Sequence, residues 1–204
     1  MNYIKNHIKD NIYAYALLTI AMVIGIIKAN FDLITMNGAN INELGQDINN
    51  VFYMMGNNSI QKDDMVLREF INIVKLLMIV WVCGSSIIGI PVIFYVVYTK
   101  GYMLGVCSGI LIKSMGINGI TLISLGILPK EIFFIPIIII LGVNGIKFST
   151  YIIKSNKLHM FRRKSVLKEF AIYSMTWIAM CIVSLGGVGI SRLAMKYVAL
   201  FYKK

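Results

Sequence analysis

Residues 76–99 read LLMIVWVCGSSIIGIPVIFYVVYT and contain no charged side chain. Lys75 and Lys100 bound this run, which is longer than the roughly 20 apolar residues that a helix needs to cross the hydrocarbon core of a bilayer. Pro91 lies within the run, and we expect it to kink the helix because proline removes a backbone hydrogen bond. The stretch predicts a transmembrane helix.

The rest of the chain repeats this pattern. Of its 204 residues 58% are hydrophobic and 14% are charged, and the mean hydropathy is +0.76, outside the usual range of soluble domains. The long apolar runs suit helices in lipid, whereas a β-barrel would need short alternating segments. We therefore predict an all-α fold, a polytopic helical membrane protein with about five transmembrane helices. It would form a single integral membrane domain over residues 1–204, with spans at about 11–34, 76–99, 101–128, 132–153 and 170–191.

Basic residues predict the orientation of these spans. The loop at about 154–169 is rich in Lys and Arg and should face the cytoplasm by the positive-inside rule. With five crossings the N-terminus, with Lys5 and Lys9, and a tight turn around Lys100 would also lie inside. The segment at about 35–70, where acids outnumber bases, would lie outside.

Two features leave the number of crossings open. The region 101–128 is broken by Lys113, Gly116 and Gly119, so it forms either one bent crossing or two half-spans. The basic residues after position 191 would lie outside, against the positive-inside rule, which keeps a sixth crossing or a re-entrant third region as alternatives. The side of the C-terminus stays open.

The external segment has helical periodicity. Apolar residues between 41 and 55 recur at helical spacing, which predicts a short amphipathic helix on the outer membrane surface or on a partner. Asp63 and Asp64 are predicted to cap a second helix that runs into the 76–99 span.

Small residues mark candidate contact faces. Gly101, Gly105 and Gly109 recur every four residues and let a second helix approach closely. The second helix belongs either to the same chain or to a homo-oligomer or partner. Ser85 and Ser86 are predicted to bond back to their own helix or to a neighbour.

Two further features are candidate sites. Lys113 is the ionisable residue expected at depth, where it marks a polar site, or else it reaches the interface from the end of a half-span. The segment from Pro129 to Pro136 is predicted to form a stiff outer corner. Glu131 lies there beside Lys130, and we expect it to be a solvated charge at a helix start. No carboxylate lies within the five apolar runs, the first of which is uncharged from Asn11 to Ile27.

Other classes of site are disfavoured. The net charge of +11 is concentrated between apolar runs, where lipid and orientation account for it, so we expect no nucleic-acid partner. The cysteines follow no metal motif, and His7 and His159 have no partner at ligand spacing, so we expect no metal and no cofactor. No nucleophile and base pair within the spans, and we predict that the chain is not an enzyme.

Several segments resemble the stage II sporulation protein M family. They follow the family's order and spacing and cover about two-fifths of the chain: WVCGSSIIGIP (81–91), KGYMLG (100–105), GILP (126–129), FFIP (133–136) and GVNGIKFS (142–149). The wider family often has His after the first proline and Glu two residues before the second. Lys130 and Phe134 stand there, which favours the sporulation branch and removes the residues of a possible catalytic pair.

The resemblance implies a role in engulfment, when the mother-cell membrane migrates around the forespore. It implies a non-catalytic scaffold at the sporulation septum and engulfing membrane. This scaffold would localise two peptidoglycan-degrading partners, the stage II sporulation proteins D and P. The alternative is a transporter or channel subunit, suggested by Lys113 and the broken region around it.

Overall fold

The computed structural model describes residues 11–35, 46, 62–86, 89–157 and 163–202, and the described residues form helices only. The principal elements are α2 (Ile12–Thr35), α4 (Lys62–Gly84), α5 (Gly89–Met115), α6 (Ile117–Leu122), the π-helix η1 (Ile123–Ile127), α7 (Leu128–Lys157) and α8 (Arg163–Tyr202). This architecture confirms the predicted all-α fold.

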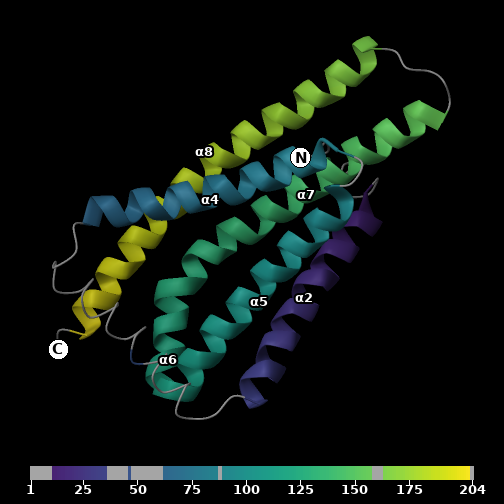
Figure 1. The fold of residues 1–204 in the computed structure, drawn as a ribbon. Coiled ribbons are helices and arrows are strands. Elements are labelled where there is room, and N and C mark those ends of the chain that lie inside the picture. The colour runs from purple at the N-terminus through teal and green to yellow at the C-terminus, as the bar shows by residue number, and fades with distance from the viewer. Residues whose placement is uncertain (1–10, 36–45, 47–61, 87–88, 158–162, 203–204) are drawn as a thin grey trace.

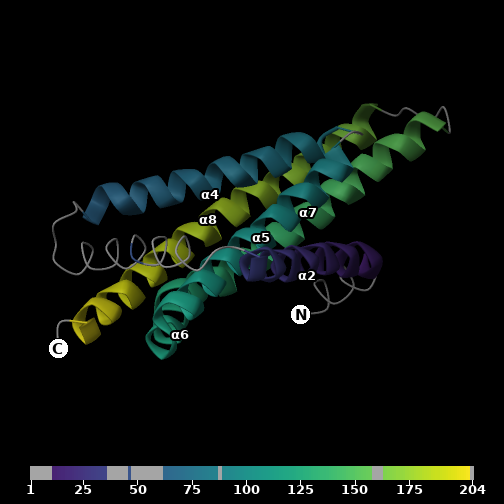
Figure 2. The ribbon, with the colours of Figure 1, turned by 60° about the horizontal axis from the view of Figure 1, so that its bottom comes forward.

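Four of these helices are long and apolar enough to cross a bilayer. The candidate spans are Ile12–Thr35, Gly89–Met115, Leu128–Ile153 and Val166–Gly189, and a shorter apolar stretch, Phe70–Gly84, lies in α4. Half of an 18-residue apolar stretch in the α7 span is buried, against 22% of such a stretch in each of the other three spans, so α7 is the central helix. It contacts α2, α4, α5 and α8. Figure 2 shows α2 and α4 at opposite sides of the bundle, with α5 and α7 between them.

The directions of the helices define the path of the chain. Successive residues of α2 lie against successive residues of α5, from Met22 beside Gly101 to Leu33 beside Gly109, so the two helices are parallel. The chain between them must therefore return to the side from which α2 began, and α4 makes this return (Figure 1). Figure 1 shows α7 antiparallel to α5 and α8 antiparallel to α7, so the five long helices among the described residues alternate in direction.

The predicted boundary between the second and third spans is wrong. The sequence analysis ended the 76–99 span at a turn around Lys100, but α4 ends at Gly84 and α5 continues without a break through Lys100 to Met115. A side chain at Gly84 would clash with the Tyr173 hydroxyl group and lie 2.8 Å from the Gly145 Cα, so close helix packing favours glycine at this end of α4. The chain reverses between Gly84 and Gly89, and Lys100 lies within a helix.

Pro91 does not kink a span, contrary to our expectation. It is the third residue of α5, within the first helical turn, where a missing N–H group leaves no intrahelical bond unmade. The proline therefore suits the start of a helix.

The region 101–128 is neither one bent crossing nor two half-spans. Its first part belongs to α5, and the chain then reverses at Gly116, whose φ of 57° favours glycine. The chain is helical again from Ile117, through α6 and η1, into α7. Figure 1 shows this segment turning back at α6 and bending before it joins α7.

The other predicted segments are placed as follows. α4 continues into the apolar run as predicted, but it begins at Lys62, so Asp63 and Asp64 lie within its first turn rather than at its cap. The amphipathic helix predicted between 41 and 55 lies almost entirely outside the described residues. The basic stretch 154–169 contains no Gly or Pro and is mostly helical, because α7 extends to Lys157 and α8 begins at Arg163. α8 then continues unbroken to Tyr202, so the described residues contain no separate helix after α8 that would make a sixth crossing.

Candidate functional site within the bundle

The glycine face of α5 packs against α2 of the same chain. A Cβ atom at Gly105 would lie 2.7 Å from the Ala29 Cβ and 2.9 Å from the Ile26 carbonyl oxygen. Gly101 and Gly109 are buried and equally tight, against Met22 and Leu33. Gly25 makes the reciprocal approach from α2, against the backbone of α5. Of the two alternatives left by the sequence, the structure shows packing within the chain, and α2 covers this face.

Lys113 contacts the end of α2. It lies in the last turn of α5, and its Nζ donates a hydrogen bond of 2.6 Å to the Leu33 carbonyl oxygen. The last carbonyl groups of a helix have no intrahelical donor, and α2 has no basic residue in its own last turn. Lys113 supplies both a donor and a positive charge there. Its position near the helix end corresponds to the interfacial interpretation rather than to a polar site at depth.

The two serines hold the reversal between α4 and α5. The Ser85 hydroxyl group donates to the Trp81 carbonyl oxygen at 2.9 Å, and that of Ser86 donates to the Cys83 carbonyl oxygen at 3.1 Å. The Ser149 hydroxyl group of α7 donates to the Ser86 carbonyl oxygen at 3.0 Å. The serines therefore bond back to their own helix, and α7 fixes the turn.

The two prolines lie at the start of α7 and within it. Pro129 is the second residue of α7, two residues after the end of η1, and it cannot donate to the carbonyl group four residues earlier, which explains why the helix changes its hydrogen-bond pattern there. Pro136 lies inside α7, and its side chain is exposed. The predicted stiff corner is thus a bend within continuous helical chain.

A buried ion pair joins α5 to α7. The Lys100 Nζ lies 3.0 Å from the Glu131 Oε1, and the two side chains are 19% and 4% exposed. The same Nζ lies 4.7 Å from the centroid of the Phe134 ring. The second carboxylate oxygen, Glu131 Oε2, is buried and has no hydrogen-bond partner. The cation therefore has two partners, whereas the anion keeps one acceptor unused.

The pair lies at the level of the middle of α5, although Glu131 is only the fourth residue of α7. Lys100 is eleven residues from the start of α5 and fifteen from its end, or roughly 16 Å and 22 Å along the helix axis. Ionisable residues at such depth are rare, pair with one another, and commonly mark a functional site. This is the candidate site of the described structure.

Neither position of the pair is the one that the sequence predicts. The charge pattern predicts Lys100 at a turn, Glu131 at an exposed edge, and no carboxylate within the apolar runs. The short segment α6–η1 brings the start of α7 back to the level of the middle of α5, which carries Glu131 into the bundle. A signal was available, because Gly84 and the two serines after it mark a helix end more clearly than Lys100 does.

Aromatic side chains join α4 to α8. The ring centroids of Trp81 and Trp177 are 5.6 Å apart, and those of Trp81 and Phe170 are 5.8 Å apart. The Tyr173 hydroxyl group donates to the Val80 carbonyl oxygen at 3.0 Å. The two indole N–H groups are buried without a hydrogen-bond partner. The cluster packs the helices together and leaves two donors unused.

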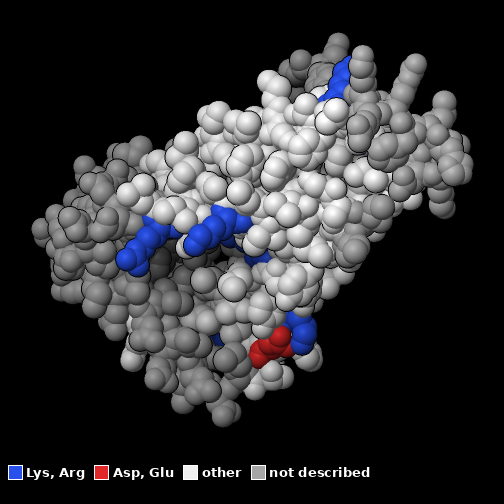
Figure 3. Space-filling model, turned by 45° about the horizontal axis from the view of Figure 1, so that its top comes forward, with Lys and Arg blue, Asp and Glu red and all other residues white. Residues whose placement is uncertain are grey.

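The described residues contain no group of three His, Cys, Asp or Glu side chains that could hold a metal ion. His7 and His159 lie outside the described residues. On the face shown in Figure 3, the described surface is mostly uncharged, with separate basic groups and one acidic group next to a basic one.

Together, the apolar helices and the buried pair define a polytopic helical membrane protein. The model of the family Stage II sporulation protein M matches residues 14–189, and the chain belongs to this family. Membership confirms the resemblance seen in the sequence and gives the protein a role in sporulation. No curated protein and no solved structure matches the chain.

Proposed function

We propose that the protein is a membrane scaffold for engulfment of the forespore. It would lie in the septal and engulfing membrane, hold the stage II sporulation proteins D and P there, and perform no catalysis itself. The family supports the setting, and the helix bundle supports the mode of action.

The observation that carries the proposal is how the bundle uses its polar groups. Lys113 bonds α5 to the end of α2, Tyr173 bonds α8 to α4, and Ser149 bonds α7 to the turn before α5. Each of these side chains donates to a backbone carbonyl group of another helix or turn, which fixes the relative positions of the elements. A body held in this way suits the binding of partners at its surface.

Sporulating cells provide the test. A tagged copy of the chain would replace the family member of an endospore-forming bacterium. We expect the proteins D and P to co-purify with it, and the mother-cell membrane to migrate around the forespore. Purified chain alone should leave septal peptidoglycan uncut. Migration with neither partner co-purifying, or cleavage by the chain alone, would refute the scaffold.

The buried ion pair favours a second candidate, a transporter or channel subunit. Lys113, which suggested this function from the sequence, caps α2, but Lys100 and Glu131 place charges at the depth where transporters bind ions. Ion flux into liposomes containing the protein, and its loss in Lys100→Met, would support this candidate. Tight liposomes that show no flux for protons, sodium or potassium would leave the pair a structural role.

A further inference from the structure

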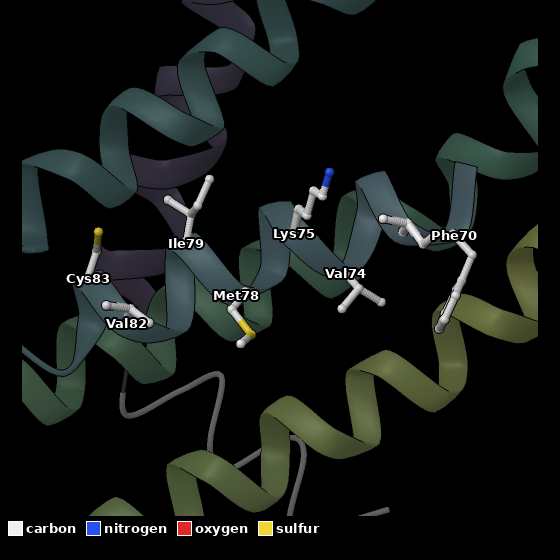
Figure 4. Close-up of a pocket in the computed structure, with 8 residues that line it drawn as sticks. Phe70, Val74, Lys75, Met78, Ile79, Val82 and Cys83 are labelled. Atoms are coloured by element: carbon white, nitrogen blue, oxygen red, sulfur yellow. The ribbon is translucent and has the colours of Figure 1, made fainter. Parts of the chain in front are cut away.

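An apolar groove follows the outward face of α4. Its cavity volume is about 600 Å³. The described residues that line it all belong to α4 and recur along four turns of the helix, as Figure 4 shows: Phe70, Ile71, Val74, Lys75, Met78, Ile79, Val82 and Cys83. Met78, Ile79 and Val82 are about half exposed, at 46%, 50% and 55%. The groove has the length and the apolar character that a second helix would match.

Lys75 is the one charged residue among those described as lining the groove. Its side chain is exposed, and no ion pair or hydrogen bond holds it among the described residues. Lys28 pairs with Asp32 and Lys100 with Glu131, whereas the exposed Lys147 and Lys168 lie six residues from the end and two from the start of their spans. The groove therefore presents an uncompensated positive charge on an apolar face.

The depth of Lys75 raises the cost of this charge. It lies nine residues before Gly84, or roughly 14 Å along the helix axis from that end of α4. A charge near the middle of the hydrocarbon core is costly and is normally paired with an opposite charge. The apolar stretch Phe70–Gly84 contains no acid that could supply the pair.

A second copy of the chain does not fit this groove. In a two-fold dimer the same face meets itself, which would bring one Lys75 close to the other across an apolar contact. Like charges at that position repel each other. The complementary occupant is a helix of a different protein that carries a carboxylate at the same depth.

We propose that the groove on α4 binds a membrane-spanning helix of another protein, and that Lys75 pairs with an Asp or Glu near the middle of that helix. The proposal rests on the scaffold function and names the surface that such a scaffold uses. The apolar lining packs against the helix, and the ion pair sets its depth and selects it.

The probe is a synthetic leucine-rich membrane-spanning peptide with a single central Glu, compared with a peptide that has Leu in its place. Each peptide carries one cysteine eight residues from its centre, on either side in separate peptides, which matches the separation of Lys75 and Cys83. The full chain carries Cys107→Ser and Cys181→Ser, so Cys83 in the groove is its one thiol. Oxidative cross-linking in phosphatidylcholine vesicles reports binding.

We expect the Glu peptide to cross-link to Cys83 roughly tenfold more than the Leu peptide. Lys75→Met should abolish this preference, and Lys75→Glu should transfer it to a peptide with a central Lys. Lys147→Met is the matched control and should change nothing, because Lys147 is an exposed lysine of α7 outside the groove. A chain that keeps only Cys107, exposed on α5, should cross-link poorly to either peptide.

Several results would overturn the proposal: equal cross-linking of both peptides, a preference that survives Lys75→Met, or equal cross-linking at Cys107. Loss of the preference in vesicles rich in anionic phosphatidylglycerol would also overturn it, since a lipid phosphate would then hold Lys75. The scaffold is tested separately, by co-purification from cells. If partners co-purify but the peptides show no preference, only the groove assignment fails; if no partner co-purifies, the scaffold fails.

Discussion

At the scale of single residues, the pairing of Lys100 with Glu131 is opposed by the cost of burying both charges. A buried ion pair loses the hydration of both charges. Good geometry and further hydrogen bonds are needed to offset this free-energy cost. Lys100 has a carboxylate oxygen and the Phe134 ring as partners, whereas Glu131 Oε2 has none. The pair therefore contributes little net stability, and removing one member leaves a bare charge.

We expect Lys100→Met and Glu131→Gln each to lower the free energy of unfolding by about 3 kcal/mol, because each leaves one charge unpaired in the bundle. The double variant should lose clearly less than the sum of the two, since it contains no bare charge. Unfolding of the protein in mixed micelles by added denaturing detergent measures all three. Additive losses would mean that the two side chains do not interact.

A second prediction concerns Lys113. Lys113→Met removes the donor to the Leu33 carbonyl group and should cost about 1 kcal/mol, the usual value of one hydrogen bond. The effect should be local, so amide hydrogen exchange should accelerate in the last turn of α2 and stay unchanged in α7. Lys147→Met serves as a control with no such contact. Faster exchange throughout the bundle would contradict a local capping role.

At the scale of elements, the sequence predicts some helices far better than others. The predicted spans at about 11–34, 132–153 and 170–191 correspond to α2, α7 and α8, because long apolar runs identify single helices reliably. The boundary at Lys100 failed for a physical reason. A lysine within an apolar run resembles a helix end unless its partner is known, and the partner, Glu131, comes from a helix 31 residues away.

The candidate site failed for the same reason, whereas the glycine face did not. Glycines spaced every four residues indicate close packing of helices, although the sequence cannot say which helix fills the face. The structure supplies α2 as this helix. The level at which Glu131 enters the bundle depends on the reversal at Gly116 and on the π-helix η1, and neither has a periodic signal in the sequence.

The contact between α2 and α5 gives the third prediction. Gly105→Ala should lower the free energy of unfolding by about 1–3 kcal/mol, because the new methyl group meets the Ala29 Cβ and the Ile26 carbonyl group. Gly186→Ala is the matched control in α8, where an added methyl group meets nothing, and should stabilise by about 0.5–1 kcal/mol. Thermal unfolding in detergent compares them. Equal effects would exclude close packing at Gly105.

At the scale of the whole molecule, parallel packing of α2 and α5 constrains the topology. Two parallel membrane helices in one chain need a return crossing between them, and α4 supplies it although its apolar part, Phe70–Gly84, is short. With five passes, the start of α2 and the end of α8 lie at opposite ends of the bundle. The reversal between Gly84 and Gly89 then lies at the end of the bundle opposite the reversal at Gly116, and we expect it to take the cytoplasmic position that the charge pattern gives to Lys100.

Labelling from the two sides checks this arrangement. In a chain with all three cysteines replaced by serine, Ile117→Cys lies just after the reversal at Gly116 and Ser86→Cys lies in the turn before α5. A membrane-impermeant maleimide should label the first in spheroplasts and the second in inverted vesicles, and Lys100→Cys in neither. Labelling of both positions from the same side would refute the five-pass path.

The glycine contacts between α2 and α5 join residues far apart in the sequence, which affects how the protein is inserted during synthesis. Gly25 packs against Gly101, which is synthesised 76 residues later. At common rates of translation, roughly 4–15 s pass between the synthesis of the two residues. During that interval α2 lies in the bilayer without the α5 helix that covers its Gly25 face. A nascent chain stalled before Gly89 should therefore hold α2 in a state that membrane proteases and insertion chaperones recognise.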